Sequence, residues 1–562
     1  MLVNVKNRKF FLGKLLFITI VSIFLSACKS NNNVHKTPSF TGDISDNESW
    51  YALPLDSRMS VTQSSAPVSG INSSLVDMDI YIPIPNSSLC VPWDDLTAPA
   101  RPCTLDDVDH DIEGDDDYEP VLNATLSTGS FSGVGEFKIR GNYSRTLAQK
   151  SYSMRLDSDI NLLDYQRKFQ LNKHLSDSSR IRNKLAYDLI RAIPNLTSLK
   201  TQFVHLSVTD DVNGTIDYGL YTHVEALREE FLINRGWNKD DNLYNANNFL
   251  FDEWALENLQ TDEDGDPLNE ANFNTFLEIK AGKDHRMISE MLRAVNSDQD
   301  IDSVVATYFS RDNYITWIAL NLVLGNQDVS YHNYFLYNPI YGKKFYFVPW
   351  DYDGAWSSTQ YLGKAEYGIA VLMEVPLHRK FLRIQKNRDD VYAMAEKLRT
   401  DYITNIRMQE LIDSYESSVL QAEPTISSWR TKAEELIPQV DTNIALYKSV
   451  IGHPMPFYER ASYSNGTFSA DWDVSEDFEG DAIVYDLNVS SDYDFNTTVL
   501  SEQNLTGLNY TNNTLNLAPG TYYMKVTSRE LDDPTHYQEA FNRLRDPADT
   551  KTIYGTVAFD VQ

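Results

Sequence analysis

Residues 326–337 read Asn-Gln-Asp-Val-Ser-Tyr-His-Asn-Tyr-Phe-Leu-Tyr, and residues 349–353 read Pro-Trp-Asp-Tyr-Asp. A helical pattern over residues 300–325 precedes them and ends at Gly325, a residue type that often terminates helices. Two short apolar runs, 334–337 and 344–350, are separated by a turn-like segment and predict a β-hairpin. The stretch therefore places Asp328 and Asn333 just before a hairpin, and Asp351 and Asp353 at its end.

This order of polar residues suits phosphoryl transfer. The reaction needs a carboxylate beside the attacking hydroxyl, and hard oxygen ligands for a cation that bridges the nucleotide phosphates. Asp-x-x-x-x-Asn followed by a hairpin and another Asp is the order of protein-kinase catalytic loops. Taken alone, the Asp-x-x-x-x-Asn pattern is common, and an Asx turn that opens a strand also explains it. On a strand, Asp351 and Asp353 would point to one face, where a cation would relieve their repulsion; a solvated turn is the alternative.

Four further motifs stand upstream of this stretch, in the order Arg140-Gly-Asn-Tyr-Ser144, Lys150-Ser-Tyr152, Arg182-Asn-Lys184 and Gly219-Leu-Tyr-Thr-His-Val-Glu225. Together with the two segments quoted first, they resemble the CotH family of atypical, metal-dependent protein kinases. The resemblance extends over roughly residues 75–450. It implies an α+β chain with a divergent protein-kinase-like fold, and no glycine-rich phosphate loop is visible in the sequence.

The resemblance also implies roles for four residues of the hairpin region. Asp328 resembles the catalytic aspartate that orients the acceptor hydroxyl. Asn333 and Asp351 resemble metal ligands, with Asp353 in support. The implied cofactors are ATP and Mg²⁺ or Mn²⁺.

Four upstream residues are predicted to hold the nucleotide. Lys150 resembles the strand lysine that pairs with phosphate, and we expect it to serve both catalysis and ATP binding; a lysine that points to solvent is the alternative. Arg140 and Arg182 are candidates to neutralise phosphate, or equally to pair with the many carboxylates of the chain. Glu225 is a candidate to pair with a basic group near the nucleotide.

The first 27 residues have the pattern of a lipoprotein signal peptide. A cationic segment precedes a short apolar run, 15–25, and Leu25-Ser-Ala-Cys28 resembles a lipobox. We expect cleavage before Cys28 and acylation of its thiol, which would anchor the protein in the cell envelope. In a Gram-negative cell, the expected location is the outer membrane or the cell surface. The run is short for a membrane span, but an uncleaved anchor helix is the alternative. Residues 28–70 predict a flexible tether.

The other cysteines, Cys90 and Cys103, are predicted to pair in an exported protein, with two free thiols as the alternative. Two acidic segments, 106–119 and 261–266, are candidates for Ca²⁺ binding, although the second does not have the spacing of an EF-hand loop.

The sequence predicts a kinase-like domain at 71–452 and a separate all-β domain at 455–562. After Pro454, short alternating runs are separated by Asn, Gly, Asp and Ser, which predicts an antiparallel sandwich. The segment Leu517-Ala-Pro-Gly-Thr-Tyr and Trp472 resemble a fibronectin type III domain.

With 80 acidic and 49 basic residues, the chain has a net charge of −31, which disfavours nucleic-acid binding. The main hypothesis is an exported, lipid-anchored kinase that phosphorylates Ser or Thr of surface or secreted proteins. The alternative is an adhesion or scaffolding lipoprotein whose kinase-like domain is inactive. A carbohydrate-binding module is a weaker third reading, because abundant Tyr and Trp are more simply core residues.

Overall fold

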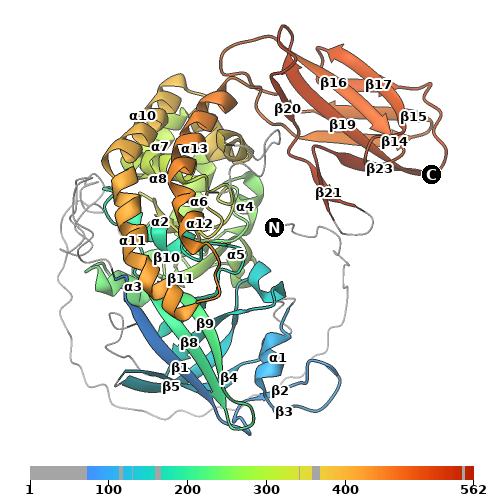
Figure 1. Ribbon diagram of the computed structural model, residues 1–562. Coiled ribbons are helices and arrows are strands. Elements are labelled where there is room, and N and C mark those ends of the chain that lie inside the picture. Colours follow the sequence, from blue (N-terminus) through green and yellow to red (C-terminus); the bar gives the residue numbers. More distant parts are fainter. Residues whose placement is uncertain are drawn as a thin grey trace.

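The computed structural model describes residues 72–112, 118–129, 131–157, 166–340, 342–356, 368–546 and 551–562. The predictions of a signal peptide, of acylated Cys28 and of a tether fall outside these residues. Figure 1 shows three parts: a β-barrel, a largely helical body and a C-terminal β domain. Within the described part of the chain, no helix combines the length and the apolar composition that a membrane span requires.

The first part is a closed seven-stranded barrel (Figure 1). Strand β1 alternates between buried and exposed residues, with Met78, Ile80 and Ile82 facing the interior, whereas β6 and β7 are buried along most of their length. The closing pair, β1 and β8, is parallel. In spatial order the strands are β1 (Leu75–Ile82), β4 (Leu122–Thr128), β5 (Phe131–Arg140), β6 (Ser151–Leu156), β7 (Lys168–Asn172), β9 (Gly214–Glu225) and β8 (Thr201–Asp210).

A short segment, residues 89–109, lies beside the barrel. Strands β2 (Leu89–Cys90) and β3 (Arg101–Pro102) pair, and the predicted disulfide between Cys90 and Cys103 is present. Helix α1 (Leu105–Asp109) begins with a capping box between Thr104 and Asp107, and Asp107 also forms an ion pair with Arg101 at 2.7 Å. The first acidic segment is thus partly explained by local structure.

The second part packs helices around a four-stranded sheet of order β11-β10-β12-β13 and contains the largest hydrophobic core. The sheet strands are β10 (Asn242–Ala246), β11 (Leu277–Ala281), β12 (Tyr334–Asn338) and β13 (Tyr346–Pro349). The helices are α2 (Arg182–Ile190), α3 (Glu229–Asn234), α4 (Glu253–Asn258), α5 (Glu270–Phe276), α6 (Arg286–Val295), α7 (Ile301–Tyr308), α8 (Arg311–Leu324), α9 (Pro376–Leu382), α10 (Gln385–Asp401), α11 (Asn405–Ala422), α12 (Trp429–Glu434) and α13 (Leu436–Ile451). Two 3-10 helices, η4 (Tyr143–Thr146) and η6 (Gly368–Glu374), lie in connecting segments.

Helix α2 is buried on all sides. Leu185 and Leu189 lie on one stripe, as in an amphipathic helix, but every residue from Asn183 to Ile190 is buried. The helix lies inside the molecule, between the barrel strand β8 and helix α11. Its polar side chains therefore need partners within the protein.

The third part is all-β, as predicted (Figure 1). One sheet has the order β14-β15-β18, and the other has β17-β16-β19-β20, with β23 also paired to β19. The likeness to fibronectin type III stays a prediction. The strands are β14 (Glu459–Ser464), β15 (Thr467–Trp472), β16 (Ile483–Ser490), β17 (Thr498–Leu505), β18 (Asn509–Asn512), β19 (Gly520–Glu530), β20 (Tyr537–Glu539), β21 (Arg543–Arg545), β22 (Thr552–Tyr554) and β23 (Val557–Val561).

Candidate active site

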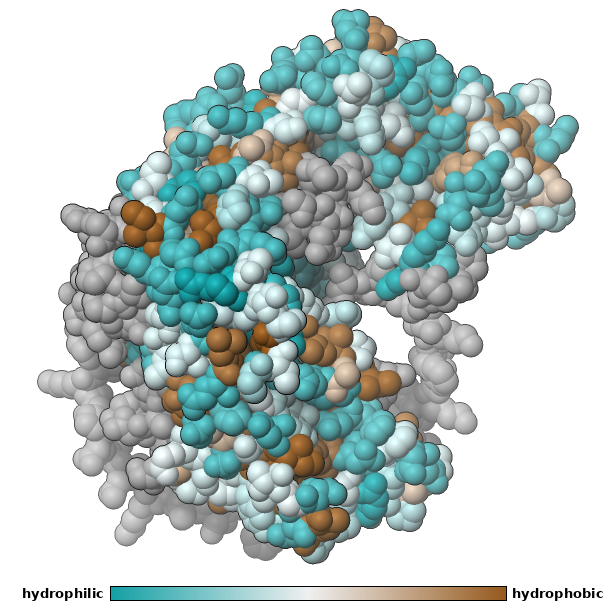
Figure 2. Space-filling model, in the orientation of Figure 1, coloured by the Kyte–Doolittle hydropathy of each residue, from teal (hydrophilic) through white to brown (hydrophobic). Residues whose placement is uncertain are grey.

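A cleft of about 1250 Å³ lies where the three parts meet. The barrel side contributes residues after β5 and β7, the helical body contributes the segments 327–333 and 350–354, and the C-terminal domain contributes β21 and β22. In the view of Figure 2, the surface is hollowed between the barrel, at the bottom, and the C-terminal domain, at the upper right. Arg140, Arg182, Asp328, Asn333, Asp351 and Asp353, all predicted as site residues, line this one cleft.

The loop that carries Asp328 begins where helix α8 ends. Gly325 closes the helix in the left-handed conformation, with φ 61°. A Cβ at this position would lie 2.6 Å from Nδ2 of Asn443, so the close approach of α13 also requires glycine. The chain then turns out of the core, and Asp328 is half-exposed to the cleft.

Two neighbours in the same loop hold the Asp328 carboxylate. The side-chain amide of Asn333 donates a hydrogen bond to Oδ2 at 2.9 Å, and Nε2 of His332 lies 2.7 Å from Oδ1. Asn333 has a left-handed backbone, φ 60°, which turns its side chain back toward the loop. Burial raises the pKa of Asp328, but the hydrogen bond and charge of His332 outweigh it and leave the pKa below its usual value. Asp328 is therefore kept ionised.

Asp351 and Asp353 meet at the end of β13, although not in the way the sequence predicts. The strand ends at Pro349, and Asp351 has a left-handed backbone, φ 57°, so a turn rather than strand alternation brings the two carboxyl groups together. Burial and the adjacent Asp353 raise the pKa of Asp351 well above its usual value. Burial and the neighbouring charge thus oppose the ionisation of both carboxyl groups at once when no cation lies between them.

Helix α2 positions this turn through two backbone contacts. The amide of Asp351 donates to the hydroxyl of Tyr187 at 3.0 Å, and the amide of Tyr352 donates to Oδ1 of Asn183 at 3.2 Å. Because Tyr187 and Asn183 are themselves buried, the turn is fixed from inside the protein. This contact gives a structural reason for the Arg-Asn-Lys motif at 182–184.

Both predicted arginines face the cleft. Burial lowers the pKa of Arg140, while the negative charges of Asp351 and Asp353 oppose that shift. Arg182 donates to the carbonyl of Ala355 at 3.0 Å, so it also braces the segment that follows Asp353. Cationic groups thus lie beside the paired carboxylates.

The structure does not bring Lys150 and Glu225 to the cleft with the others. Gln149 and Ser151 are among the lining residues, and Lys150 between them directs its ammonium to the carbonyl of Arg145. Glu225 is fully buried in a two-pronged ion pair with Arg235, at 2.8 and 2.7 Å. Its basic partner exists, but neither residue is among the described residues that line the cleft.

Sequence reasoning missed three basic residues of the cleft. His174 contacts Asp353, with Nδ1 3.4 Å from Oδ2, and Lys173 lies next to it along the chain. His332 is four residues after Asp328, a spacing at which side chains meet in one turn of chain, so it could have been noticed. Nothing near 173–174 in the sequence signals their position, because β7 reaches the cleft only through barrel closure.

The oxygen donors at the end of the hairpin suit a hard divalent cation. Asp351 and Asp353 place like charges side by side, which contributes to the raised pKa of Asp351, and the side-chain amide of Asn333 lines the same cleft. Carboxylate and amide oxygens are the ligands that Mg²⁺ and Mn²⁺ prefer. These residues therefore fit the metal that the sequence predicts, while the assignment of each ligand stays a prediction.

The second acidic segment does not gather carboxylates. Asp262 instead accepts hydrogen bonds from the backbone amides of Asp264 and Asp266, at 2.9 and 3.0 Å, as in a tight turn. Ca²⁺ binding at either acidic segment stays a prediction.

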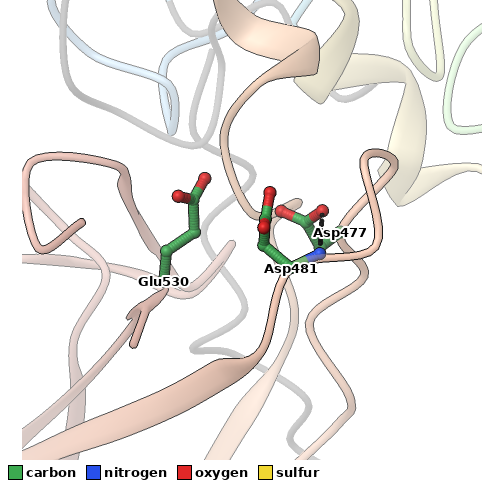
Figure 3. Close-up of side chains that lie close together, drawn as sticks. All are labelled: Asp477, Asp481 and Glu530. Atoms are coloured by element: carbon green, nitrogen blue, oxygen red, sulfur yellow. Dashed lines mark hydrogen bonds between the residues drawn. The ribbon is translucent and has the colours of Figure 1, made fainter. Parts of the chain in front are cut away.

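One group of three carboxylates close enough to share an ion occurs within the described residues, and it lies in the C-terminal domain. Asp477, Asp481 and Glu530 each place an oxygen within 4.8 Å of the others (Figure 3). Glu530 is also paired with His536, whose Nδ1 lies 2.8 Å from Oε1. These three carboxylates do not line the cleft.

Comparison with known proteins agrees with the motif pattern. A family model described as CotH kinase protein matches residues 137–451, more than half of the chain. The chain is 25% identical over 258 residues to the inner spore coat protein H of Bacillus subtilis strain 168, across 46% of this chain and 67% of that protein. It is also similar to a chain in the complex of HipA, HipB and operator DNA of a Shewanella oneidensis MR-1 toxin–antitoxin system, at 14% identity and a TM-score of 0.24. That match covers 59% of this chain and 64% of the other, and so low a score supports no conclusion.

Proposed function

The chain belongs to the CotH kinase protein family, and from this membership we propose that it transfers the γ-phosphoryl group of ATP to Ser or Thr of other proteins. The observation that carries the proposal is the shared cleft: a half-exposed, ionised Asp328, the amide of Asn333 and the Asp351–Asp353 pair all line it. A protein that used this domain only as a scaffold would gain nothing from two like charges set side by side in a cleft.

Each residue then has a defined task. Mg²⁺ or Mn²⁺ would neutralise charge on the nucleotide phosphates. Asp351, Asp353 and Asn333 supply its oxygen ligands. Asp328 accepts a hydrogen bond from the acceptor hydroxyl and orients it for attack. Arg140, at the end of β5, and Arg182, at the start of α2, stabilise phosphate charge.

The proposed location is the cell envelope. The Bacillus subtilis relative is named as a spore coat protein, which supports a surface role for this chain as well. A lipid on Cys28 would provide the attachment, and the protein acceptors would then be surface or secreted proteins. Replacing Cys28 by Ala should move the protein from the membrane to the soluble fraction.

The test of the activity is label transfer from γ-labelled ATP by the chain from residue 29 onward, with Mg²⁺ or Mn²⁺ and a mixture of protein acceptors. We expect Asp328→Ala and Asp351→Ala each to lower transfer by about 10³-fold. Asp298→Ala removes an exposed carboxylate in the loop between α6 and α7 and serves as the matched control, with transfer unchanged.

The same experiment separates the kinase from the scaffold. Label incorporation equal to the background of both variants, with either metal, would favour an adhesion or scaffolding lipoprotein. A shift in melting temperature with Mg²⁺ and a non-hydrolysable ATP analogue then shows whether the cleft still binds nucleotide.

A further inference from the structure

The C-terminal domain contributes a wall of the cleft. Strands β21 and β22 pair antiparallel, and Arg543, Arg545, Thr552 and Tyr554 of this pair are among the cleft-lining residues. In Figure 1 the β21–β22 pair extends from the C-terminal domain toward the rest of the molecule. The cleft that holds Asp328 is therefore closed on one side by residues some 200 positions away in the sequence.

The position of this strand pair is set by contacts at its base. Phe541 is buried in the hydrophobic core of the helical body, and its amide donates to the carbonyl of Phe457 at 2.7 Å. Asn542 is bonded to both the amide and the carbonyl of Glu459, and it accepts from the amide of Gly555 at 2.7 Å. The two strands thus leave a fixed base.

A charged contact ties the strand pair to the segment that follows the metal-binding turn. The Arg543 guanidinium lies 3.5 Å from Glu374, the last residue of η6, and Glu374 also accepts the hydroxyl hydrogen of Tyr458 at 2.6 Å. Helix η6 is the next described element after Asp353, and its residue Val371 lines the cleft as well. The strand pair therefore borders the region beyond the metal site.

The cleft has room for two reactants. A nucleotide-sized ligand occupies a pocket of about 300–1000 Å³, whereas this cleft measures about 1250 Å³. We place the nucleotide phosphates beside Arg140, which lies close enough to Asp351 and Asp353 for their charges to oppose the lowering of its pKa by burial. The end of the cleft bordered by β21 and β22 is then left for the second reactant, the acceptor.

The chemistry at that end differs from the rest of this acidic protein. Arg545 is exposed, and Arg543 is close by on the same strand. Arginine recognises carboxylate and phosphate groups through parallel hydrogen bonds. We infer that the β21–β22 strand pair is the acceptor-binding wall of the cleft, and that it selects Ser or Thr acceptors flanked by acidic residues.

This inference rests on the proposed kinase function but has its own binding test. The full chain, with Mg²⁺ and a non-hydrolysable ATP analogue, is titrated into fluorescein-labelled serine peptides that carry flanking Asp, neutral or Lys residues. We expect the Asp peptide to bind about tenfold more tightly than the neutral one at physiological salt. Non-specific attraction to a chain with a net charge of −31 would favour the Lys peptide instead. The order of affinities therefore distinguishes specific binding at the wall from non-specific binding.

Charge reversal at one position assigns the effect to the wall. Arg545→Glu should weaken binding of the Asp peptide about tenfold and leave the neutral peptide within twofold, while Arg545→Lys should retain part of the preference. Arg460→Glu, an exposed arginine on β14, is the matched control and should change neither peptide.

Four outcomes are decisive. Equal binding of acidic and neutral peptides, or an equal effect of Arg460→Glu, overturns the acceptor-wall inference. So does an increase in the KM of ATP as the main effect of Arg545→Glu, because the wall would then serve the nucleotide. Arg545-dependent binding without any label transfer would instead sustain the wall and reject the kinase.

Discussion

Helix α2 contacts two groups of charged side chains that differ in kind. Within the helix, Nζ of buried Lys184 lies 2.9 Å from Oδ2 of buried Asp188, and Tyr415 donates to the same oxygen at 2.6 Å. Through Tyr187 the same helix holds the backbone of Asp351, whose carboxyl adjoins that of Asp353, with Arg140 and His174 nearby. The first group is compensated inside the protein, and the second has negative charge in excess. The first serves folding, and the second is arranged for a ligand that brings positive charge.

The comparison shows that burial alone does not mark a functional site. Lys184 and Asp188 are as buried as any residue of the cleft, yet each meets a partner, and Lys184 also contacts Thr201 at 3.3 Å. A buried charge becomes a candidate for binding when its own neighbours leave it uncompensated. Three predictions test this difference between compensated and uncompensated charge.

The largest effect is expected when the compensated pair is broken. Lys184→Met leaves Asp188 buried without its counter-charge, and we expect the free energy of unfolding to fall by about 4 kcal/mol, as measured by urea denaturation. The double variant Lys184→Met with Asp188→Leu removes both charges and should recover most of that loss. If the double variant is as unstable as the single one, the ion pair is not the reason.

The second prediction concerns His378, a buried group that stays neutral. We expect it to have an intermediate effect on the free energy of unfolding, and this effect should depend on pH. His378 is enclosed in the core, and burial lowers its pKa to about 3, from the usual 6.5. Between these values the unfolded chain binds the extra proton, so stability is complete above pH 6.5 and falls as the pH decreases toward 3. From pH 7 to pH 5 this residue should contribute a loss of about 2 kcal/mol.

The measurement compares urea denaturation of the wild type and of His378→Gln across that pH range. The variant keeps a polar side chain beside Tyr314, which contacts His378 at 2.6 Å, but it cannot take up a proton. Its free energy of unfolding should decrease less steeply with falling pH than that of the wild type. The difference in slope should correspond to the uptake of close to one proton. Parallel curves for the two proteins would contradict the assignment.

The smallest change in stability is expected at the uncompensated pair, and with the opposite sign. Asp351→Asn removes one of two like charges, so without metal the protein should be about 1 kcal/mol more stable, by urea denaturation. The stabilisation that Mg²⁺ and an ATP analogue give the wild type should disappear. A loss of several kcal/mol in the metal-free variant would place Asp351 with Lys184, as a residue that the fold requires.

The local parts of the site could be predicted from the sequence. Asp328, Asn333 and Asp351 are within 24 positions of one another and are separated by one hairpin, so chain connectivity alone brings them to one end of a sheet. The helix stop at Gly325 is likewise a local signal that the structure bears out, because Gly325 supplies the left-handed turn.

Predictions that depended on the direction of a side chain were less successful. Lys150 lies just before β6 rather than on the strand, and its ammonium turns to the carbonyl of Arg145, while its neighbours Gln149 and Ser151 line the cleft. Helix α2 looks amphipathic because its apolar residues form a stripe, whereas its polar residues find partners from α11 and β8. Partners so distant leave no trace in a local pattern.

The sequence by itself determined the family, because the carboxylates and the amide of its motifs occur in fixed order around one hairpin. Only the tertiary structure decided which basic residues share the cleft with those carboxylates. His174 arrives through the closure of the barrel, and Arg545 through the docking of a separate domain. The physical reason is that such contacts depend on how strands pair and cores pack over hundreds of residues, whereas connectivity constrains only the neighbours along the chain.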